Sequence, residues 1–194
     1  MPQYYIFHKP YGVLSQFSSD GDKKALSDYF PHLPKNIYPV GRLDHDSEGM
    51  LLLTDDKSLT HQLLDPSFAH PRTYWAQVEG TITDEALQQL MRGVQISLDG
   101  KKYLTKKTQA VILENAPSVS ERNPQVRFRK NIPTSWISLT LTEGKNRQVR
   151  RMTAAVGFPT LRLIRHAIGK LTLDGIQPGG YKLMGNEAKN LLLS

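Results

Sequence analysis

The chain has 194 residues and a formal net charge of +7, from 25 Lys and Arg against 18 Asp and Glu, with a pI near 9.6. The absence of cysteine excludes disulfides, thiolate metal sites and cysteine nucleophiles, and is compatible with a reducing, cytoplasmic compartment. The chain has no long apolar run and no N-terminal signal pattern, so we expect neither a membrane span nor a secretory leader, and the basic charge favours a polyanionic partner such as nucleic acid.

Short strands and helices alternate along the predicted fold. Strands or extended segments are expected at Tyr4–His8, Tyr38–Val40, Met50–Leu53, Arg72–Glu79, Gln109–Leu113, Trp136–Thr142, Thr160–Ile164 and Lys170–Leu173. Helices are expected at Lys24–Tyr29, Lys57–Leu64, Asp84–Arg92 and Asn146–Val156. Thr83 can cap the third helix and Gly93 can end it. This order predicts an α+β fold with a mixed, largely antiparallel sheet flanked by helices, in a single domain over residues 1–194.

Charge is unevenly distributed. Residues 144–170 contain seven Lys or Arg and no acid, whereas residues 41–56 contain five acids and one arginine. The segment Glu114–Thr134 has three prolines, four basic residues and no apolar periodicity, so we expect a long basic loop that is a functional insertion or a mobile segment. A basic surface and a separate acidic loop together suggest polyanion binding combined with carboxylate chemistry.

The acidic loop at residues 41–56 is open to several interpretations. Its acids partly fit a calcium-binding frame, but Asp55 stands where a bidentate Glu is usual, and Pro39 and Gly41 occupy the place of the incoming helix. A magnesium-dependent nuclease is another candidate, although the six histidines show no metal-ligand spacing. Asp46 and Ser47 are typical of a solvated turn that caps local amides. Asp44 differs, because it ends an extended segment and can be held rigidly, as catalysis requires.

Four motifs in chain order resemble those of the pseudouridine synthases of the RsuA/RluB/RluE/RluF group. The central motif is Gly-Arg-Leu-Asp at residues 41–44, followed by Ser47, Gly49 and an apolar run. The others are Lys-Pro-x-Gly at 9–12, Arg-Thr-Tyr at 72–74, and the stretch 143–152, continued by 163–169. Residues 132–136, 146–152 and 158–165 most resemble the branch that modifies large-subunit ribosomal RNA.

The resemblance implies conversion of uridine to pseudouridine in 23S ribosomal RNA, with roles for three catalytic residues. Asp44 would be the catalytic carboxylate, and an aspartate with the ordinary pKa of ~3.9 is ionised at neutral pH. Tyr74 would stack on the uracil and handle a proton after the new carbon–carbon bond forms. Arg150 would supply the cation that a buried carboxylate needs, with Val149 as its apolar neighbour.

Further residues would bind RNA. Arg42 would help to displace the target nucleotide, since a stacked base has to leave its helix to be modified. Lys9 would support the fold or contact phosphate. The remaining expected RNA contacts come from the third motif and beyond: Arg147, Arg151 and Arg165.

The same resemblance implies no metal or organic cofactor. Many members of the group begin with a small S4 RNA-binding domain. Here the first motif begins at Lys9, so we expect no S4 domain and recognition of RNA by the catalytic domain itself. Nothing in the sequence requires more than a monomer. The alternative from another class is an RNA-binding ribosome-assembly factor without catalysis.

Overall fold

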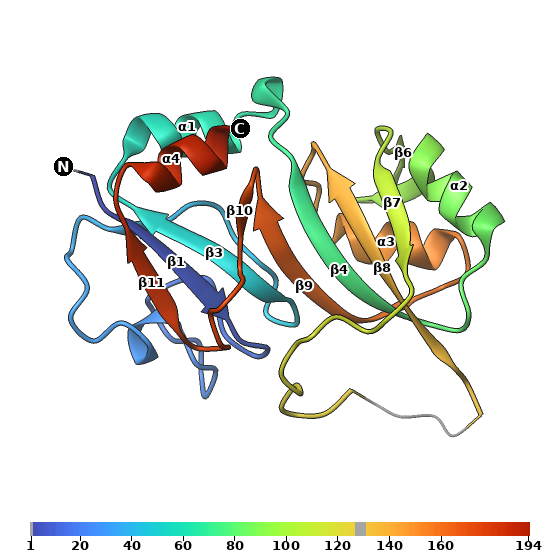
Figure 1. Ribbon diagram of the computed structural model, residues 1–194, viewed down its shortest axis with the longest axis horizontal. Helices are drawn as coiled ribbons and strands as arrows, with labels where there is room; N and C mark the ends of the chain where they lie inside the picture. The colour runs from blue at the N-terminus through green and yellow to red at the C-terminus, as the bar shows by residue number, and fades with distance from the viewer. Residues whose placement is uncertain (1, 127–130) are drawn as a thin grey trace. The chain divides into compact units, whose positions relative to one another are not determined.

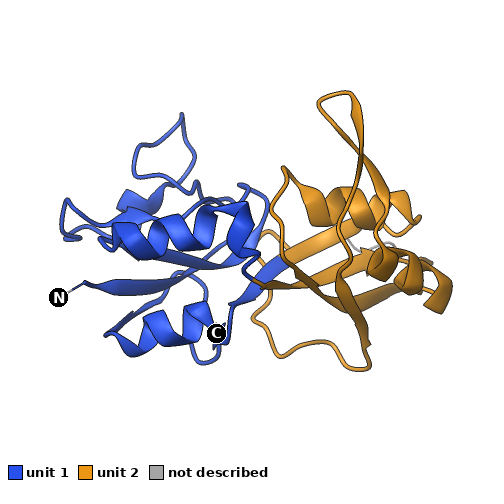
Figure 2. Cartoon of the chain, turned by 90° about the horizontal axis from the view of Figure 1, so that it is seen from above, with its two compact units in different colours: residues 1–70, 164–194 blue, residues 71–163 orange. Residues whose placement is uncertain are grey.

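A computed structural model describes residues 2–126 and 131–194, and the chain divides into two compact units (Figures 1 and 2). Unit 1 comprises residues 1–70 and 164–194, and unit 2 comprises residues 71–163. The chain passes from unit 2 back to unit 1 within strand β9, Thr160–Ile168. The expectation of one catalytic domain over residues 1–194 stays a prediction.

Unit 1 is built on a sheet in which β1 (Tyr4–Lys9) lies between two antiparallel neighbours (Figure 1). These neighbours are β11 (Tyr181–Met184) and β3 (Glu48–Thr54). The other edge of β3 pairs in parallel with β9, so the sheet is mixed, as expected. Two short strands, β2 (Tyr38–Pro39) and β10 (Leu171–Thr172), pair with β3 and β9.

Both faces of the central strands in unit 1 are buried. Every residue of β1 and β3 is buried, which explains why each strand carries a continuous apolar run rather than an alternating pattern. One face packs in a cluster made of Tyr5, Phe7, Leu26, Phe30, Ile37, Leu51 and Leu53. The unit also contains the helices α1 (Lys57–Leu64) and α4 (Glu187–Leu193) and the 3₁₀ turns Leu26–Asp28 and Pro66–Phe68.

Unit 2 contains an antiparallel sheet in the order β4 (Arg72–Glu79), β8 (Thr134–Leu141) and β7 (Gln109–Leu113). A separate hairpin is formed by β5 (Gln95–Leu98) and β6 (Lys101–Leu104). Helix α2 (Asp84–Arg92) lies against β7, and helix α3 (Gln148–Ala155) lies against β5. Apolar side chains of both helices, the hairpin and the sheet form one core.

The expected bounds of α1, β4, α2 and β7 are confirmed to the residue. Thr83 caps α2 through its side chain, and Gly93 ends the helix, as expected. The short helix expected at Lys24–Tyr29 is instead a 3₁₀ turn, and β9 continues past its expected end.

Three strands and one α-helix were not expected: β5, β6, β11 and α4. The hairpin of β5 and β6 had a local signal, because Asp99-Gly100 is a favoured turn pair between two short strands. Strand β11 and helix α4 are too short to show a clear periodic pattern of apolar residues. In the described part of the segment Glu114–Thr134, the chain forms neither helix nor strand until β8 begins at Thr134, and Arg127, Arg129 and Lys130 lie outside the described residues.

Candidate active site

Asp44 lies on a tight turn between β2 and β3 of unit 1. The N–H of Ser47 donates to the carbonyl of Asp44 at 3.0 Å and closes the turn. The side chain of Asp44 is half-buried, whereas Arg42 is exposed and Ser47 is buried. The turn thus leads into β3 and presents a partly accessible aspartate two residues after an exposed arginine.

The segment that follows β1 holds the backbone on both sides of Asp44. The hydroxyl of Ser15 donates to the carbonyl of Leu43 at 2.8 Å and accepts the N–H of the same residue at 3.0 Å. The N–H of Gly12 donates to the carbonyl of His45 at 2.9 Å. Because Leu43 and His45 are the two neighbours of Asp44 in the chain, these three bonds restrict its position.

Lys9 stabilises the turn that carries Gly12. Its side chain is fully buried, and the ammonium group donates to the carbonyls of Pro10 at 3.0 Å and of Val13 at 2.8 Å. A lysine without solvent contact cannot bind an RNA phosphate in this conformation. Of the two roles expected for Lys9, support of the fold and contact with phosphate, this placement favours the first.

The amine of Lys9 also lies among charged neighbours of the same unit. Burial lowers the pKa of Lys9 to about 7, while the carboxylates of Glu48, Asp46 and Asp44 act in the opposite direction and Arg165 lowers it further. The amine can therefore gain or lose a proton near neutral pH. Its charge is coupled electrostatically to the loop that carries Asp44.

Arg165 is tied to β3 and is almost fully buried. It is 5% exposed, and its Nε donates to the carbonyl of Met50 at 2.7 Å. Its backbone pairs with Gly49 in the parallel register of β3 and β9. Gly49 has φ +109°, and a Cβ there would lie 2.4 Å from the carbonyl oxygen of Arg165, so only glycine fits. The expected RNA contact of Arg165 stays a prediction, and the structure adds a packing role.

In unit 2, Tyr74 lies on β4 opposite Leu139 of β8. It is half-buried and packs against the core of unit 2, on the same face of the strand as the buried Ala76. The strand therefore holds the ring rigidly while part of its surface stays accessible. Such a ring can stack on a planar base.

Helix α3 carries Val149 and Arg150. Val149 is 5% exposed and belongs to the core of unit 2. Arg150 is half-buried, and its Nη1 donates to the carbonyl of Thr160 at 3.4 Å. The side chain is thus not a freely solvated helix arginine.

The start of α3 carries the other two expected RNA contacts. Arg147 is exposed and precedes the helix with φ +50°. Arg151 is half-buried; its guanidinium donates to the backbone and side-chain oxygens of Asn146 and to the carbonyl of Ser97. Arg151 therefore joins the start of α3 to the β5–β6 hairpin, and its expected phosphate contact stays a prediction.

A buried carboxylate organises the same region. Glu143 is 7% exposed and accepts the N–H of Lys106 at 2.8 Å, together with bonds from the hydroxyl of Tyr103 and the side-chain amide of Gln148. The pKa of Tyr103 is raised, mainly because its hydroxyl donates a hydrogen bond to Glu143. Glu143 thus fixes the start of α3, a helix that carries three of the expected site residues, Val149, Arg150 and Arg151.

The sequence reasoning did not identify Ser15 or Glu143 as supporting residues. Glu143 had a signal, since it opens the third motif, but Ser15 is an isolated serine whose partner lies 28 residues further along the chain. The residues expected to act together divide between the units. Asp44, Arg42, Lys9 and Arg165 lie in unit 1, and the remaining five, Tyr74, Arg147, Val149, Arg150 and Arg151, lie in unit 2.

Residues 2–126 and 131–194 contain no group of three or more His, Asp and Glu side chains placed to hold a metal ion. No helix in these ranges has the length and apolar character needed to cross a membrane.

A family model described as RNA pseudouridylate synthase matches residues 3–155. This match covers more than half of the chain and includes Asp44, Tyr74 and Arg150. The chain belongs to the RNA pseudouridylate synthase family.

Relatives with curated names belong to the same family. The chain is 53% identical over 175 residues to a "Ribosomal large subunit pseudouridine synthase E" of Xanthomonas axonopodis, covering 89% of each chain. It is 49% identical over 177 residues to the protein of the same name in Vibrio parahaemolyticus, covering 91% of this chain and 71% of the relative.

A solved pseudouridylate synthase has the same fold. Its crystal structure matches with a TM-score of 0.80 and 26% identity, covering 99% of this chain and 74% of that one. The fold expected from the sequence, a mixed and mostly antiparallel sheet with flanking helices, is therefore confirmed as that of a pseudouridine synthase.

Proposed function

We propose that this protein isomerises one uridine of large-subunit ribosomal RNA to pseudouridine, with Asp44 as the catalytic carboxylate. The substrate class is supported by about 50% identity to two curated large-subunit enzymes over nearly the whole chain. The observation that carries the role of Asp44 is its place on a turn held by Ser15 and Gly12, with its carboxylate half-buried.

The proposed reaction breaks the bond between N1 of uracil and C1′ of the ribose, rotates the base and joins C5 to C1′. The proton lost from C5 is balanced by a proton gained at N1, so no oxidant or reductant is needed. The carboxylate of Asp44 acts as nucleophile or base in this sequence. Its rigid support is relevant because reacting atoms have to be held close to their attack geometry.

The proposal includes roles for the other expected residues. Arg42, which is exposed, fills the space of the flipped nucleotide, because a planar guanidinium can both stack and pair with phosphate. Tyr74 stacks on the uracil, and Arg150 supplies positive charge to the reaction. The protein works in the cytoplasm, where it binds its RNA as a monomer.

The test is the substitution Asp44→Asn, which keeps the size of the side chain and removes the carboxylate. We expect ribosomal RNA from cells that lack the protein to lose one pseudouridine, and the wild-type protein to restore it. Asp44→Asn should bind the RNA with wild-type affinity but restore nothing. Asp46→Asn, in the same turn, is the matched control and should retain turnover.

Two results would contradict the proposal. Pseudouridine formation by Asp44→Asn at the wild-type rate would remove Asp44 from the chemistry. An unchanged pseudouridine map in cells without the protein, together with a ribosome-assembly defect that Asp44→Asn repairs, would favour a non-catalytic assembly factor.

A further inference from the structure

Several basic residues of the stretches 114–134 and 144–170 are engaged by the protein itself. Arg162 is 6% exposed and donates to the carbonyl of Ser120 at 2.9 Å. Arg122, in the long loop, donates to carbonyls of Pro124 at 2.8 Å and Gln125 at 3.2 Å. Together with the buried Arg165 and the tethered Arg151, these side chains shape the fold. Direct contacts to a polyanion are more readily made by basic side chains that are exposed.

The β5–β6 hairpin of unit 2 and the residues directly after it supply such side chains. Four lysines lie within seven residues, and no acid occurs between Gly100 and Leu113. All four are exposed: Lys101, Lys102, Lys106 and Lys107. Within the described ranges none of the four is in an ion pair, so their charges are not compensated by a carboxylate of the chain.

The hairpin is held firmly enough to present these lysines as a surface. Ile96 is buried in the core of unit 2, and its partner across the hairpin, Tyr103, packs against the same core. The N–H of Thr105 donates to the carbonyl of Val94 at 3.0 Å, and the hydroxyl of Thr105 accepts the N–H of Val94 at 2.9 Å. One face of the hairpin is therefore fixed, and the alternation of strand residues leaves Lys102 on the other face.

The hairpin also adjoins the loop before α3. The ammonium group of Lys145 lies 5.1 Å from the ring centre of Tyr103, within the range of a cation–π contact. The N–H of Lys106 donates to Glu143, whose side chain is buried. Lys145 and Arg147 thus extend the basic surface of the hairpin within unit 2.

We propose that these six residues, Lys101, Lys102, Lys106, Lys107, Lys145 and Arg147, form a surface that binds the phosphodiester backbone of the RNA substrate. We call it the hairpin surface. The inference rests on the proposed function for the identity of the polyanion. The proposed function favours RNA over an acidic protein as the polyanion, and lysines can bind its phosphates as point charges. Backbone contacts of this kind add affinity without reading the base sequence.

The test compares two variants with the same change in net charge. The first, K101Q/K102Q/K106Q/K107Q, removes the four lysines of the hairpin. The matched control, K24Q/K35Q/K57Q/K182Q, removes four exposed lysines of unit 1. A third variant with arginine at all four hairpin positions keeps the charge. Thermal melting verifies that each variant folds.

Binding to a large-subunit ribosomal RNA fragment is measured by fluorescence anisotropy at several salt concentrations. We expect the hairpin glutamine variant to bind at least about tenfold more weakly at physiological salt. Its plot of log association constant against log salt concentration should be less steep, by about 3. The unit 1 control and the arginine variant should stay close to wild type. In turnover assays the KM for RNA should rise with the loss of affinity, while kcat at saturating RNA should stay within about twofold of wild type.

The outcomes separate this inference from the proposed function. Equal affinity and equal salt slope for the hairpin glutamine variant and the unit 1 control would overturn the hairpin surface, even if the enzyme forms pseudouridine. Loss of binding to poly-glutamate without loss of RNA binding would also overturn it, in favour of an acidic protein partner. Absence of pseudouridine formation by the wild-type protein would contradict the proposed function, while the RNA-binding comparison would still stand.

Discussion

At the scale of single residues, Ser15 is the clearest support of the candidate catalytic carboxylate. It is 5% exposed and pairs with both backbone groups of Leu43, the residue before Asp44. Removing its hydroxyl would leave a buried N–H and a buried carbonyl without a partner. The local backbone would then have to shift or find water, and Asp44 would move with it.

We therefore expect Ser15→Ala to lower kcat on the order of 10- to 100-fold, because small misplacements of a catalytic group have effects of this size. The free energy of unfolding should fall by about 1–3 kcal/mol. Single-turnover rates with saturating RNA, measured well below the melting temperature, verify the effect on kcat, and the KM for RNA should change little.

The matched control is Ser18→Ala, since Ser18 is an exposed residue whose hydroxyl accepts a bond from the side chain of Gln16, two residues away. An unchanged kcat in Ser15→Ala, or an equal loss in Ser18→Ala, would show that the hydrogen bonds of Ser15 do not position Asp44.

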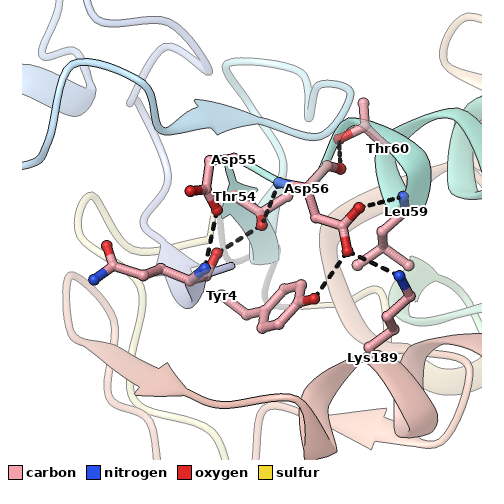
Figure 3. Close-up of polar contacts among 8 residues, drawn as sticks. Tyr4, Thr54, Asp55, Asp56, Leu59, Thr60 and Lys189 are labelled. Carbon is pink, nitrogen blue, oxygen red and sulfur yellow. Dashed lines mark hydrogen bonds and ion pairs between the residues drawn. The ribbon is translucent and has the colours of Figure 1, made fainter. Parts of the chain in front are cut away.

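At the scale of elements, Asp56 joins α1, β1 and α4 in unit 1 (Figure 3). Its carboxylate accepts the N–H of Leu59 at 2.9 Å and so caps α1. It also accepts the hydroxyl of Tyr4 at 2.9 Å and the ammonium group of Lys189 at 3.0 Å. Burial by itself raises the pKa of Asp56, but the bonds from Leu59, Lys189 and Tyr4 outweigh it and the pKa is lowered. Burial and the same carboxylate raise the pKa of Tyr4 to about 12.

These bonds predict graded losses of stability. Asp56→Ala removes the cap and both side-chain bonds, so the free energy of unfolding at pH 7 should fall by about 2–3 kcal/mol. Asp56→Asn should cost less than Asp56→Ala, because the amide oxygen can still cap α1, although the amide nitrogen cannot accept the bonds from Tyr4 and Lys189. Lys189→Met should cost no more than about 1 kcal/mol, since Lys189 is 35% exposed. Urea unfolding measures all three.

The direction in which the pKa of Asp56 is shifted determines how the free energy of unfolding depends on pH. Since the pKa of Asp56 is lower in the folded than in the unfolded chain, its contribution is complete above the ordinary value near 3.8 and is lost as the pH falls below it. Urea unfolding between pH 7 and pH 3 should show this component in the wild type and not in Asp56→Asn. If the free energy of unfolding depended on pH in the same way in the wild type and in Asp56→Asn, Asp56 would not be the source of this component.

At the scale of the whole molecule, the net charge of +7 and its distribution bear on how strongly the protein binds RNA. Four uncompensated lysines on the hairpin of unit 2 and the exposed residues before α3 are placed to release counterions on binding. Affinity should therefore depend on ionic strength more than on base sequence.

For the wild-type protein we expect the logarithm of the RNA association constant to fall with the logarithm of the salt concentration. If four or more phosphates are contacted, the slope should be about −3 or steeper. Titrations at 50 to 300 mM salt measure the slope. A flat dependence would show that the basic residues, those of the hairpin surface included, are ordinary solvated side chains.

The sequence by itself determined the features that depend on near neighbours. Thr83 and Gly93 delimit α2 because caps act within one helical turn, and the apolar runs of β1 and β3 predict buried strands. Four motifs in chain order identified the family, and the motif at residues 41–44 named Asp44 as the catalytic candidate. Each of these signals is contained in a short stretch of chain.

The tertiary structure alone decided which basic residues are available and what holds Asp44 in place. Arg165 was an expected RNA contact and Arg162 lies in the basic stretch 144–170, but both are buried and donate to backbone carbonyls. Ser15 finds its partner 28 residues away, and Lys189 finds Asp56 across 133 residues. Hydrogen bonds over such separations exist only after the chain has folded, so no local pattern encodes them.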